Sequence, residues 1–143
     1  MISEILEKCG LGKSEYIIKI SSRKITEELF KRININDNQQ KLTTLRALDK
    51  IDRLGWQSVK DLLGKGRKDK SGDFTKGANL SPINIEIIEK ELKKKTPETE
   101  DLNEVFKIFK NYNFDNFEFD PSIIRGLEYY TGTIFEVDLK FDV

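Results

Sequence analysis

Apolar positions follow helical spacing through most of the chain and alternating spacing near its ends. The spacing predicts a short helix over residues 2–9, ended by Gly10, and the β-branched run 16–20 predicts a strand. Ser22 is suited to cap a second helix, which we expect to end before the asparagine-rich stretch 34–38. That stretch is the first expected boundary between structural units.

The middle of the chain is helical in pattern. From Gln39 to Leu54, leucine and isoleucine recur at every third position. In a helix of 3.6 residues per turn, positions three residues apart are displaced by about 60° around the helix axis. The apolar side chains therefore do not stay on one face, and this helix requires apolar contacts on more than one side. Gly55 ends it, and a second, short amphipathic helix follows. The glycine-rich, charged stretch 64–79 predicts a mobile loop.

Two further helix starts have a hydroxyl cap followed by proline. Ser81-Pro82 and Thr96-Pro97 each place proline at the first helical position, where its missing N–H costs no hydrogen bond. The second of these helices has four apolar residues on one face. Together these elements predict a small all-helical unit over residues 39–111.

After Tyr112 the period changes to two, which is typical of strands with one covered face. We expect strands at 123–127 and 135–143, joined by a turn at Thr131-Gly132 into an antiparallel hairpin. Two or three strands with a flat apolar face are not stable alone. Either the hairpin packs on the helical unit, or its neighbours belong to a longer chain, and we expect the second arrangement.

Composition excludes several kinds of catalytic site. The 143 residues include no histidine, which rules out histidine-based acid–base catalysis, Ser-His and Cys-His nucleophiles and the common zinc sites. Cys9 is the one cysteine, so it forms no disulfide within the chain, and we expect a buried apolar thiol. No apolar run reaches the ~18–20 residues that cross a bilayer, so we expect a cytoplasmic protein.

Charge is uneven along the chain although its formal net charge is zero. Residues 1–38 carry a net +1, residues 39–95 carry +6 and residues 96–143 carry −7. A basic middle segment indicates an anionic partner for that part alone. The alternative is a lysine-rich helical surface that is merely well solvated.

One local pattern imitates a metal site. Asp69, Ser71 and Asp73 have the spacing of a calcium loop, but Phe74 stands at the required glycine and Leu80 at the final glutamate. We expect no metal site in the chain.

The segment with the clearest chemistry begins at Arg125. Its guanidinium is a fixed cation with a planar set of donors, suited to carboxylate or phosphate oxygens. Gly126 permits a close approach of a ligand, Glu128 adds a carboxylate, and Tyr129 and Tyr130 offer flat walls with hydroxyls. The alternative is a salt bridge between Arg125 and a neighbouring carboxylate, with the tyrosines covering the sheet.

Residues 120–136 closely resemble the histidine-specific signature of histidyl-tRNA synthetases, commonly Arg-Gly-Leu-Asp-Tyr-Tyr. Residues 16–23 resemble the strand and Ser-Arg turn that follow motif 2 of class II synthetases. Residues 46–55, 66–69 and 72–78 resemble the insertion domain of the bacterial enzymes, so the resemblance covers essentially the whole chain. It implies an α+β fold, in which a small all-helical insertion domain is flanked by pieces of an antiparallel catalytic sheet.

The resemblance implies three units. Residues 1–38 would be a helix-strand-helix piece of the catalytic core, 39–111 the insertion domain, and 112–143 a core β-hairpin with the histidine-specific motif. The three class II motifs, the second histidine-specific motif and the anticodon-binding domain have no counterpart in this sequence. We therefore expect an internal fragment of a histidine–tRNA ligase that makes no histidyl-adenylate alone.

The resemblance also assigns roles. Arg125 matches the catalytic arginine that meets the substrate carboxylate and the α-phosphate of ATP, and Tyr129 and Tyr130 match the pair lining the histidine pocket. Glu128 stands where aspartate is commoner and receives no role. ATP would be a substrate, with Mg²⁺ in the whole enzyme and neither bound by the fragment alone.

The basic insert would face the acceptor stem of tRNA(His), and the whole enzyme would be a homodimer. The candidate phosphate contacts are Lys65, Arg67, Lys68, Lys70 and Lys76. One alternative is a non-catalytic synthetase-like paralogue that regulates histidine biosynthesis, although such a regulator needs neither Arg125 nor a basic insert. A stand-alone tRNA-binding module is the other alternative.

Overall fold

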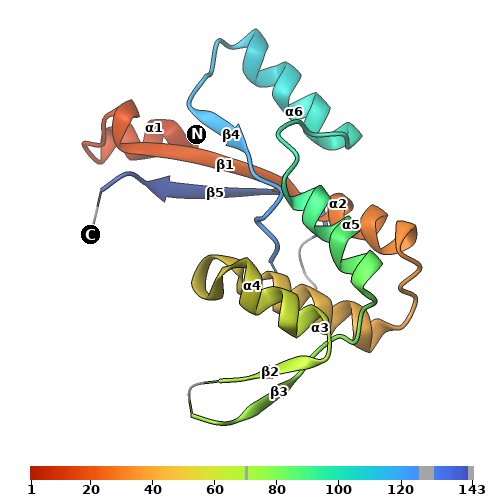
Figure 1. Cartoon of the computed structure of the whole chain (residues 1–143). Coiled ribbons are helices and arrows are strands. Elements are labelled where there is room, and N and C mark those ends of the chain that lie inside the picture. The colour runs from red at the N-terminus through yellow and green to blue at the C-terminus, as the bar shows by residue number, and fades with distance from the viewer. Residues whose placement is uncertain (70, 126–130, 142–143) are drawn as a thin grey trace.

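The computed structural model describes residues 1–69, 71–125 and 131–141 and confirms the α+β class. Figure 1 shows a three-stranded sheet with helices beside it at one end, further helices in the middle and a two-stranded hairpin at the far end. The helices are α1 (Ile2–Lys8), α2 (Arg23–Arg32), α3 (Asn38–Leu48), α4 (Ile51–Leu63), α5 (Pro82–Leu92) and α6 (Glu100–Asn111). The strands are β1 (Tyr16–Ser22), β2 (Gly66–Lys68), β3 (Phe74–Lys76), β4 (Phe117–Phe119) and β5 (Thr133–Leu139), and a 3-10 turn spans Lys13–Glu15.

Strand β1 is the centre of the sheet, whose order is β4-β1-β5. It pairs antiparallel with β5 over its whole length, from Tyr16 opposite Leu139 to Ser22 opposite Thr133. It pairs parallel with β4, so the sheet is mixed rather than purely antiparallel. The alternation in β1 buries one face, and Ile20 there has no exposed surface.

The strand predicted at 123–127 is wrong in its described part, because residues 123–125 have no strand structure. The antiparallel partner of β5 is β1 instead. Ile123 and Ile124 are both buried, and Ile124 packs into the core of the helical part. The chain here crosses from the sheet to the helices, so its apolar residues are not available for an extended pair with β5.

The single helix predicted from Gln39 to Gly55 is divided. Helix α3 ends at Leu48, α4 starts at Ile51, and Gly55 then kinks α4 with a φ of 74°. A three-residue period cannot keep one face of a straight helix against one partner. Because the apolar positions are divided between two packed helices, Leu45 and Leu48 lie in the same core as the end of α4.

The loop predicted over 64–79 is wrong, because this segment forms the hairpin β2–β3. Its base is joined to the end of α4 by backbone hydrogen bonds. Ala78 N–H donates to Leu62 at 2.8 Å, and Leu80 N–H donates to Leu63 at 2.9 Å. Asp69 closes the tip by accepting from the backbone N–H of Ser71 at 2.9 Å.

The described residues form two apolar cores. The core of the sheet contains Tyr16, Ile25 and Leu102, so α6 packs on β1 although it lies within 39–111. The other core is made by α3, α4 and α5, and Leu29 of α2 belongs to it. Helix α2 therefore enters both cores. The division of the chain at residues 38 and 111 stays a prediction.

Two of the predicted caps are confirmed and one start is shifted. The Ser22 side chain accepts from Lys24 N–H at 3.2 Å and Ser81 accepts from Asn84 N–H at 3.2 Å, with proline following Ser81. Helix α6 starts at Glu100 rather than at Pro97. Its first turn contains acidic residues, which the helix dipole favours at that end.

Asp101 of α6 joins that helix to β1. It accepts a hydrogen bond of 2.6 Å from the Ser22 hydroxyl. Burial acts to raise the pKa of Asp101, but the Ser22 hydrogen bond and nearby Lys24 lower it by more, so the net pKa lies below its ordinary value.

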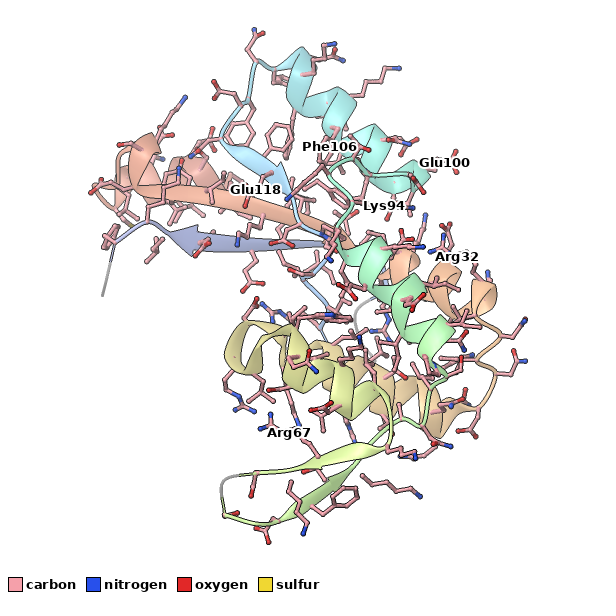
Figure 2. The ribbon with its side chains drawn as sticks, viewed as in Figure 1. Arg32, Arg67, Lys94, Glu100, Phe106 and Glu118 are labelled. Atoms are coloured by element: carbon pink, nitrogen blue, oxygen red, sulfur yellow. The ribbon has the colours of Figure 1, made fainter. Side chains whose placement is uncertain are left out.

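Charged side chains also hold α2 against α5. Figure 2 labels Arg32, which forms an ion pair with Glu91. Lys94 lies 3.0 Å from the same carboxylate. These contacts join α5 to α2, the helix that directly follows β1 of the sheet.

The N-terminal helix is confirmed, with one correction. Helix α1 ends at Lys8, and Gly10 takes a φ of +95°, a backbone conformation that glycine adopts without strain. Cys9 is exposed, so the expectation of a buried thiol is wrong.

We predict that Gly66→Ala unfolds more easily than the matched variant Gly72→Ala. Both glycines have positive φ, but a Cβ at Gly66 would lie 2.2 Å from the Thr75 carbonyl oxygen, whereas at Gly72 it would meet nothing within 4 Å. We expect losses of about 3 and about 1 kcal/mol in the free energy of unfolding, measured by urea denaturation. Equal losses would mean that the hairpin is not closed as described.

Candidate functional site

The face of the sheet opposite the apolar core is charged. It contains a lysine and an arginine surrounded by four carboxylates. Lys19 Nζ lies 3.0 Å from Asp138, 3.5 Å from Asp120 and 4.0 Å from Glu118. We call this set the charged face: Lys19, Glu118, Asp120, Arg125, Glu136 and Asp138.

The pKa of Lys19 is raised above its ordinary value. The hydrogen bond to Asp138 is the main cause, and the charges of Asp120 and Asp138 outweigh the opposing effect of burial. Lys19 therefore keeps its positive charge throughout the physiological pH range. Sequence reasoning missed this residue, although a lysine between Ile18 and Ile20 in a strand was a signal for it.

Arg125 lies at the edge of the charged face. Its guanidinium forms an ion pair with Glu136 and lies 3.6 Å from Asp49, at the end of α3. Its backbone carbonyl accepts a hydrogen bond of 3.0 Å from the side chain of Arg23. Burial acts to lower the pKa of Arg125, but Glu136 and then Asp49 raise it by more.

These contacts are the internal salt bridge that the sequence left open as the alternative for Arg125. The side chain is 32% exposed, so the ion pair is in contact with solvent. In the described part of the chain, Arg125 lines none of the four principal cavities. Gly126, Glu128, Tyr129 and Tyr130 lie outside the described residues, and the roles expected of Arg125 and the two tyrosines stay predictions.

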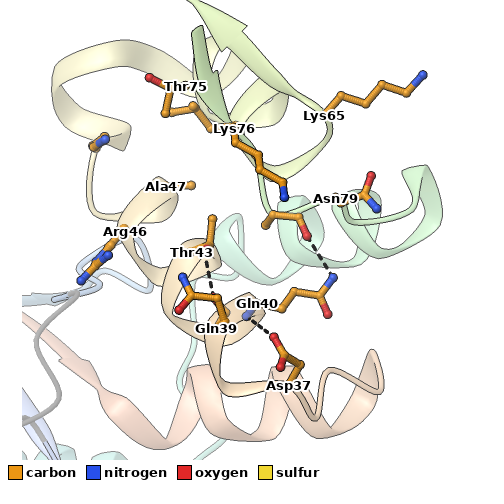
Figure 3. Close-up of a pocket in the computed structure, with 14 residues that line it drawn as sticks. Asp37, Gln39, Gln40, Thr43, Arg46, Ala47, Lys65, Thr75, Lys76 and Asn79 are labelled. Carbon is orange, nitrogen blue, oxygen red and sulfur yellow. Dashed lines mark hydrogen bonds between the residues drawn. The ribbon is translucent and has the colours of Figure 1, made fainter.

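The basic candidates are distributed around the hairpin. Arg67 and Lys68 belong to β2 and Lys76 to β3, while Lys65 precedes β2. Lys65 and Lys76 line a cavity against α3, shown in Figure 3, and Arg67 and Lys68 do not. Lys70 lies outside the described residues. The structure therefore brings together only two of the four described candidates.

Residues 1–69, 71–125 and 131–141 contain no group of three or more acidic, cysteine or histidine side chains placed to hold a metal ion. None of the helices described is both long enough and apolar enough to span a membrane.

Comparison with known sequences identifies relatives along the whole chain. A family model described as histidyl-tRNA synthetase matches residues 1–139. The histidine–tRNA ligase of Bartonella bacilliformis is 39% identical over 168 residues, covering 100% of this chain and 34% of that protein. That of Rhizobium meliloti is 37% identical over 167 residues, covering 100% and 33%. The chain thus spans about a third of the length of the curated relatives it matches.

Comparison with solved structures confirms the expected fold. Histidyl-tRNA synthetase from Nostoc sp. PCC 7120 matches with a TM-score of 0.71 and 23% identity, over 96% of this chain and 34% of that chain. A structure described as an ATP phosphoribosyltransferase regulatory subunit/histidyl-tRNA synthetase from Bacillus halodurans matches with a TM-score of 0.63 and 18% identity, over 97% and 37%. At these identities the likeness concerns the fold alone.

We predict a small, salt-sensitive coupling between Arg125 and Glu136. A double-mutant cycle of Arg125→Ala and Glu136→Gln, followed by urea denaturation, should give about 0.5–1 kcal/mol at low salt, because the pair is partly exposed. The i,i+4 pair of Glu89 and Lys93 at the end of α5 is the control, for which we expect about 0.3–0.5 kcal/mol. Zero coupling would contradict the ion pair and free the guanidinium for another partner.

Proposed function

Because the chain belongs to the histidyl-tRNA synthetase family, we propose that it is part of a histidine–tRNA ligase. Such an enzyme activates histidine with ATP to histidyl-adenylate and transfers the histidyl group to tRNA(His). The observation that carries this proposal is the identity of up to 39% with histidine–tRNA ligases over the whole chain. The acceptor stem of tRNA(His) and a second subunit are proposed partners of the whole enzyme.

A regulatory paralogue is the second candidate. It is favoured by the likeness to the Bacillus halodurans structure, which is described as an ATP phosphoribosyltransferase regulatory subunit/histidyl-tRNA synthetase. That likeness has 18% identity and concerns the fold, whereas the curated relatives at 39% and 37% are ligases. The ligase is therefore the better supported function.

Arg125 is the proposed catalytic residue. In adenylate formation a carboxylate oxygen of histidine attacks the α-phosphorus of ATP, and pyrophosphate leaves with the electron pair of the broken P–O bond. A fixed cation beside the attacked phosphorus stabilises the negative charge that develops there. Glu136 contacts one end of the guanidinium, and the group has five N–H donors in all, so donors remain for a substrate oxygen.

Tyr129 and Tyr130 are proposed to line the histidine pocket, as in the family motif that they match. Mg²⁺ accompanies ATP in the proposed activity. Among the described residues, no group of three or more acidic, cysteine or histidine side chains is placed to hold a metal ion.

The proposal is tested by a chimera in which this chain replaces the matched third of the Bartonella bacilliformis ligase. We expect histidine-dependent ATP–pyrophosphate exchange above background, because the relative supplies the rest of the enzyme. The 143-residue chain alone should show no exchange, and the ligase with the matched third deleted is the control. A folded chimera without exchange would contradict the ligase function, and exchange by the chain alone would contradict the expected inactive fragment.

We predict that Arg125→Ala in this chimera slows adenylate formation by about 10²–10³-fold, because the transition state loses a fixed cation. The affinity for tRNA should change far less. Arg125→Lys should recover part of the rate, since it keeps the charge without the planar donors. The exposed Arg53→Ala is the matched control. Equal losses in adenylate formation and tRNA affinity would count against the assigned role.

A further inference from the structure

A carboxylate of the helical part reaches Arg125, the proposed catalytic residue. Asp49 is the C-cap residue of α3, and its Oδ1 atom lies 3.6 Å from Nη1 of Arg125. Glu136, which belongs to β5 of the sheet, contacts the other terminal nitrogen, Nη2. One guanidinium thus lies between a carboxylate of the sheet and a carboxylate of the helices. Asp49 was not among the candidates from the sequence.

The backbone is fixed at both ends of the contact between Asp49 and Arg125. Leu48 and Ile124, the residues that directly precede them, are both buried in the core of the helical part. The Asp49 N–H donates a backbone hydrogen bond of 2.9 Å into α3. The Arg125 carbonyl accepts a hydrogen bond of 3.0 Å from the side chain of Arg23. The separation of the two residues is therefore set by core packing rather than by the ion pair itself.

The Asp49 side chain caps neither of the helices that it joins. Helix α3 ends there through backbone hydrogen bonds. Helix α4 begins after Lys50, its cap residue, which forms no side-chain cap hydrogen bond. In the part of the chain that the structure describes, Arg125 is the one ion-pair partner of Asp49. The carboxylate therefore acts on Arg125 rather than on the local helix structure.

Two carboxylates on different nitrogens restrict a guanidinium more than one carboxylate does. With Glu136 alone, the group could turn about a single contact, whereas a second contact at Nη1 limits that rotation. A guanidinium has five N–H donors, so about three remain for substrate oxygens when one donor faces each carboxylate. A substrate can then bind without displacing Asp49. A cation that is already oriented needs no reorganisation when negative charge develops beside it.

We propose that Asp49 is a positioning residue for Arg125 in adenylate formation. Together with Glu136 it orients the guanidinium towards the α-phosphate of ATP. The inference rests on the proposed function, because it gives Asp49 a part in the same reaction. The helical part thereby contributes a residue to a step in which tRNA takes no part.

The test uses the chimera described above and measures histidine-dependent ATP–pyrophosphate exchange. Asp49→Asn keeps the size of the side chain and removes its charge, so kcat should fall about tenfold, because the cation is no longer held in place. The KM for ATP should change by less than about threefold. Asp49→Glu retains the carboxylate and should recover most of the rate. The matched control is Asp52→Asn, at an exposed position in the first turn of α4, which should leave kcat within about twofold.

Dependence on Arg125 distinguishes a positioning role from a merely structural one. In the Arg125→Ala background, Asp49→Asn should cause no further loss of rate, because a positioning residue acts only through its partner. A further loss of the same size would overturn the proposal. Unchanged exchange by Asp49→Asn alone would overturn it too, and faster exchange would mean that the carboxylate competes with the substrate for Arg125.

The contact itself is tested on the 143-residue chain by nuclear magnetic resonance with isotope-labelled arginine. Asp49→Asn should shift the Nε–H signal of Arg125, which is identified by its loss in Arg125→Ala, and Asp52→Asn should not. An unchanged signal would overturn the proposal even in an active enzyme. An unmodified chimera without exchange contradicts the ligase function, whereas an active chimera that is insensitive to Asp49→Asn contradicts only the role of Asp49.

Discussion

The antiparallel pairing of β1 with β5 is the constraint on which the rest of the structure depends. It joins residues 16–22 to residues 133–139 through seven matched positions. The segment between them must therefore leave the sheet and return to it at the same place. Arg23 stands at that place. Its backbone N–H donates to the Gly132 carbonyl at 2.9 Å, and its side chain donates to the Arg125 carbonyl at 3.0 Å.

This constraint explains why the helical part is attached through two cores. Helix α2 leaves the sheet with Ile25 in one core and Leu29 in the other, and Ile124 returns from the helical core towards β5. Each crossing residue is buried, so movement of the helices against the sheet would expose apolar surface to water. The position of the helical part relative to the charged face follows from these crossings.

The charged face contains an ion pair at Arg125, the residue that we propose to be catalytic. Glu136 is opposite Lys19 in the register of β1 and β5, and it also meets Arg125. A partly exposed pair of this kind adds little to stability, and together with the 3.6 Å contact to Asp49 it places the guanidinium between two carboxylates. In the proposed ligase function, a cation placed in this way would stabilise the charge of the transition state, because fixed charges need no reorganisation when that state forms.

The sequence by itself determined the elements that depend on neighbouring residues. These are α1, the strand starting at Tyr16, and the helix caps at Ser22 and Ser81. Periodicity and capping depend on residues a few positions apart, so a single sequence contains them. The hairpin at 66–76 was missed because both its strands are short and polar, with no alternation to distinguish them from a loop.

Only the tertiary structure decided the partner of Arg125 and the residues that line the cavity between α3 and the β2–β3 hairpin. Glu136 and Asp49 reach Arg125 because β1 selects β5 as its neighbour and because α3 ends beside it. Arg46 and Lys76 are thirty residues apart and share a cleft because glycines let the hairpin close against α4. Such contacts depend on the register and packing of distant segments, and no local pattern of residue types contains that information.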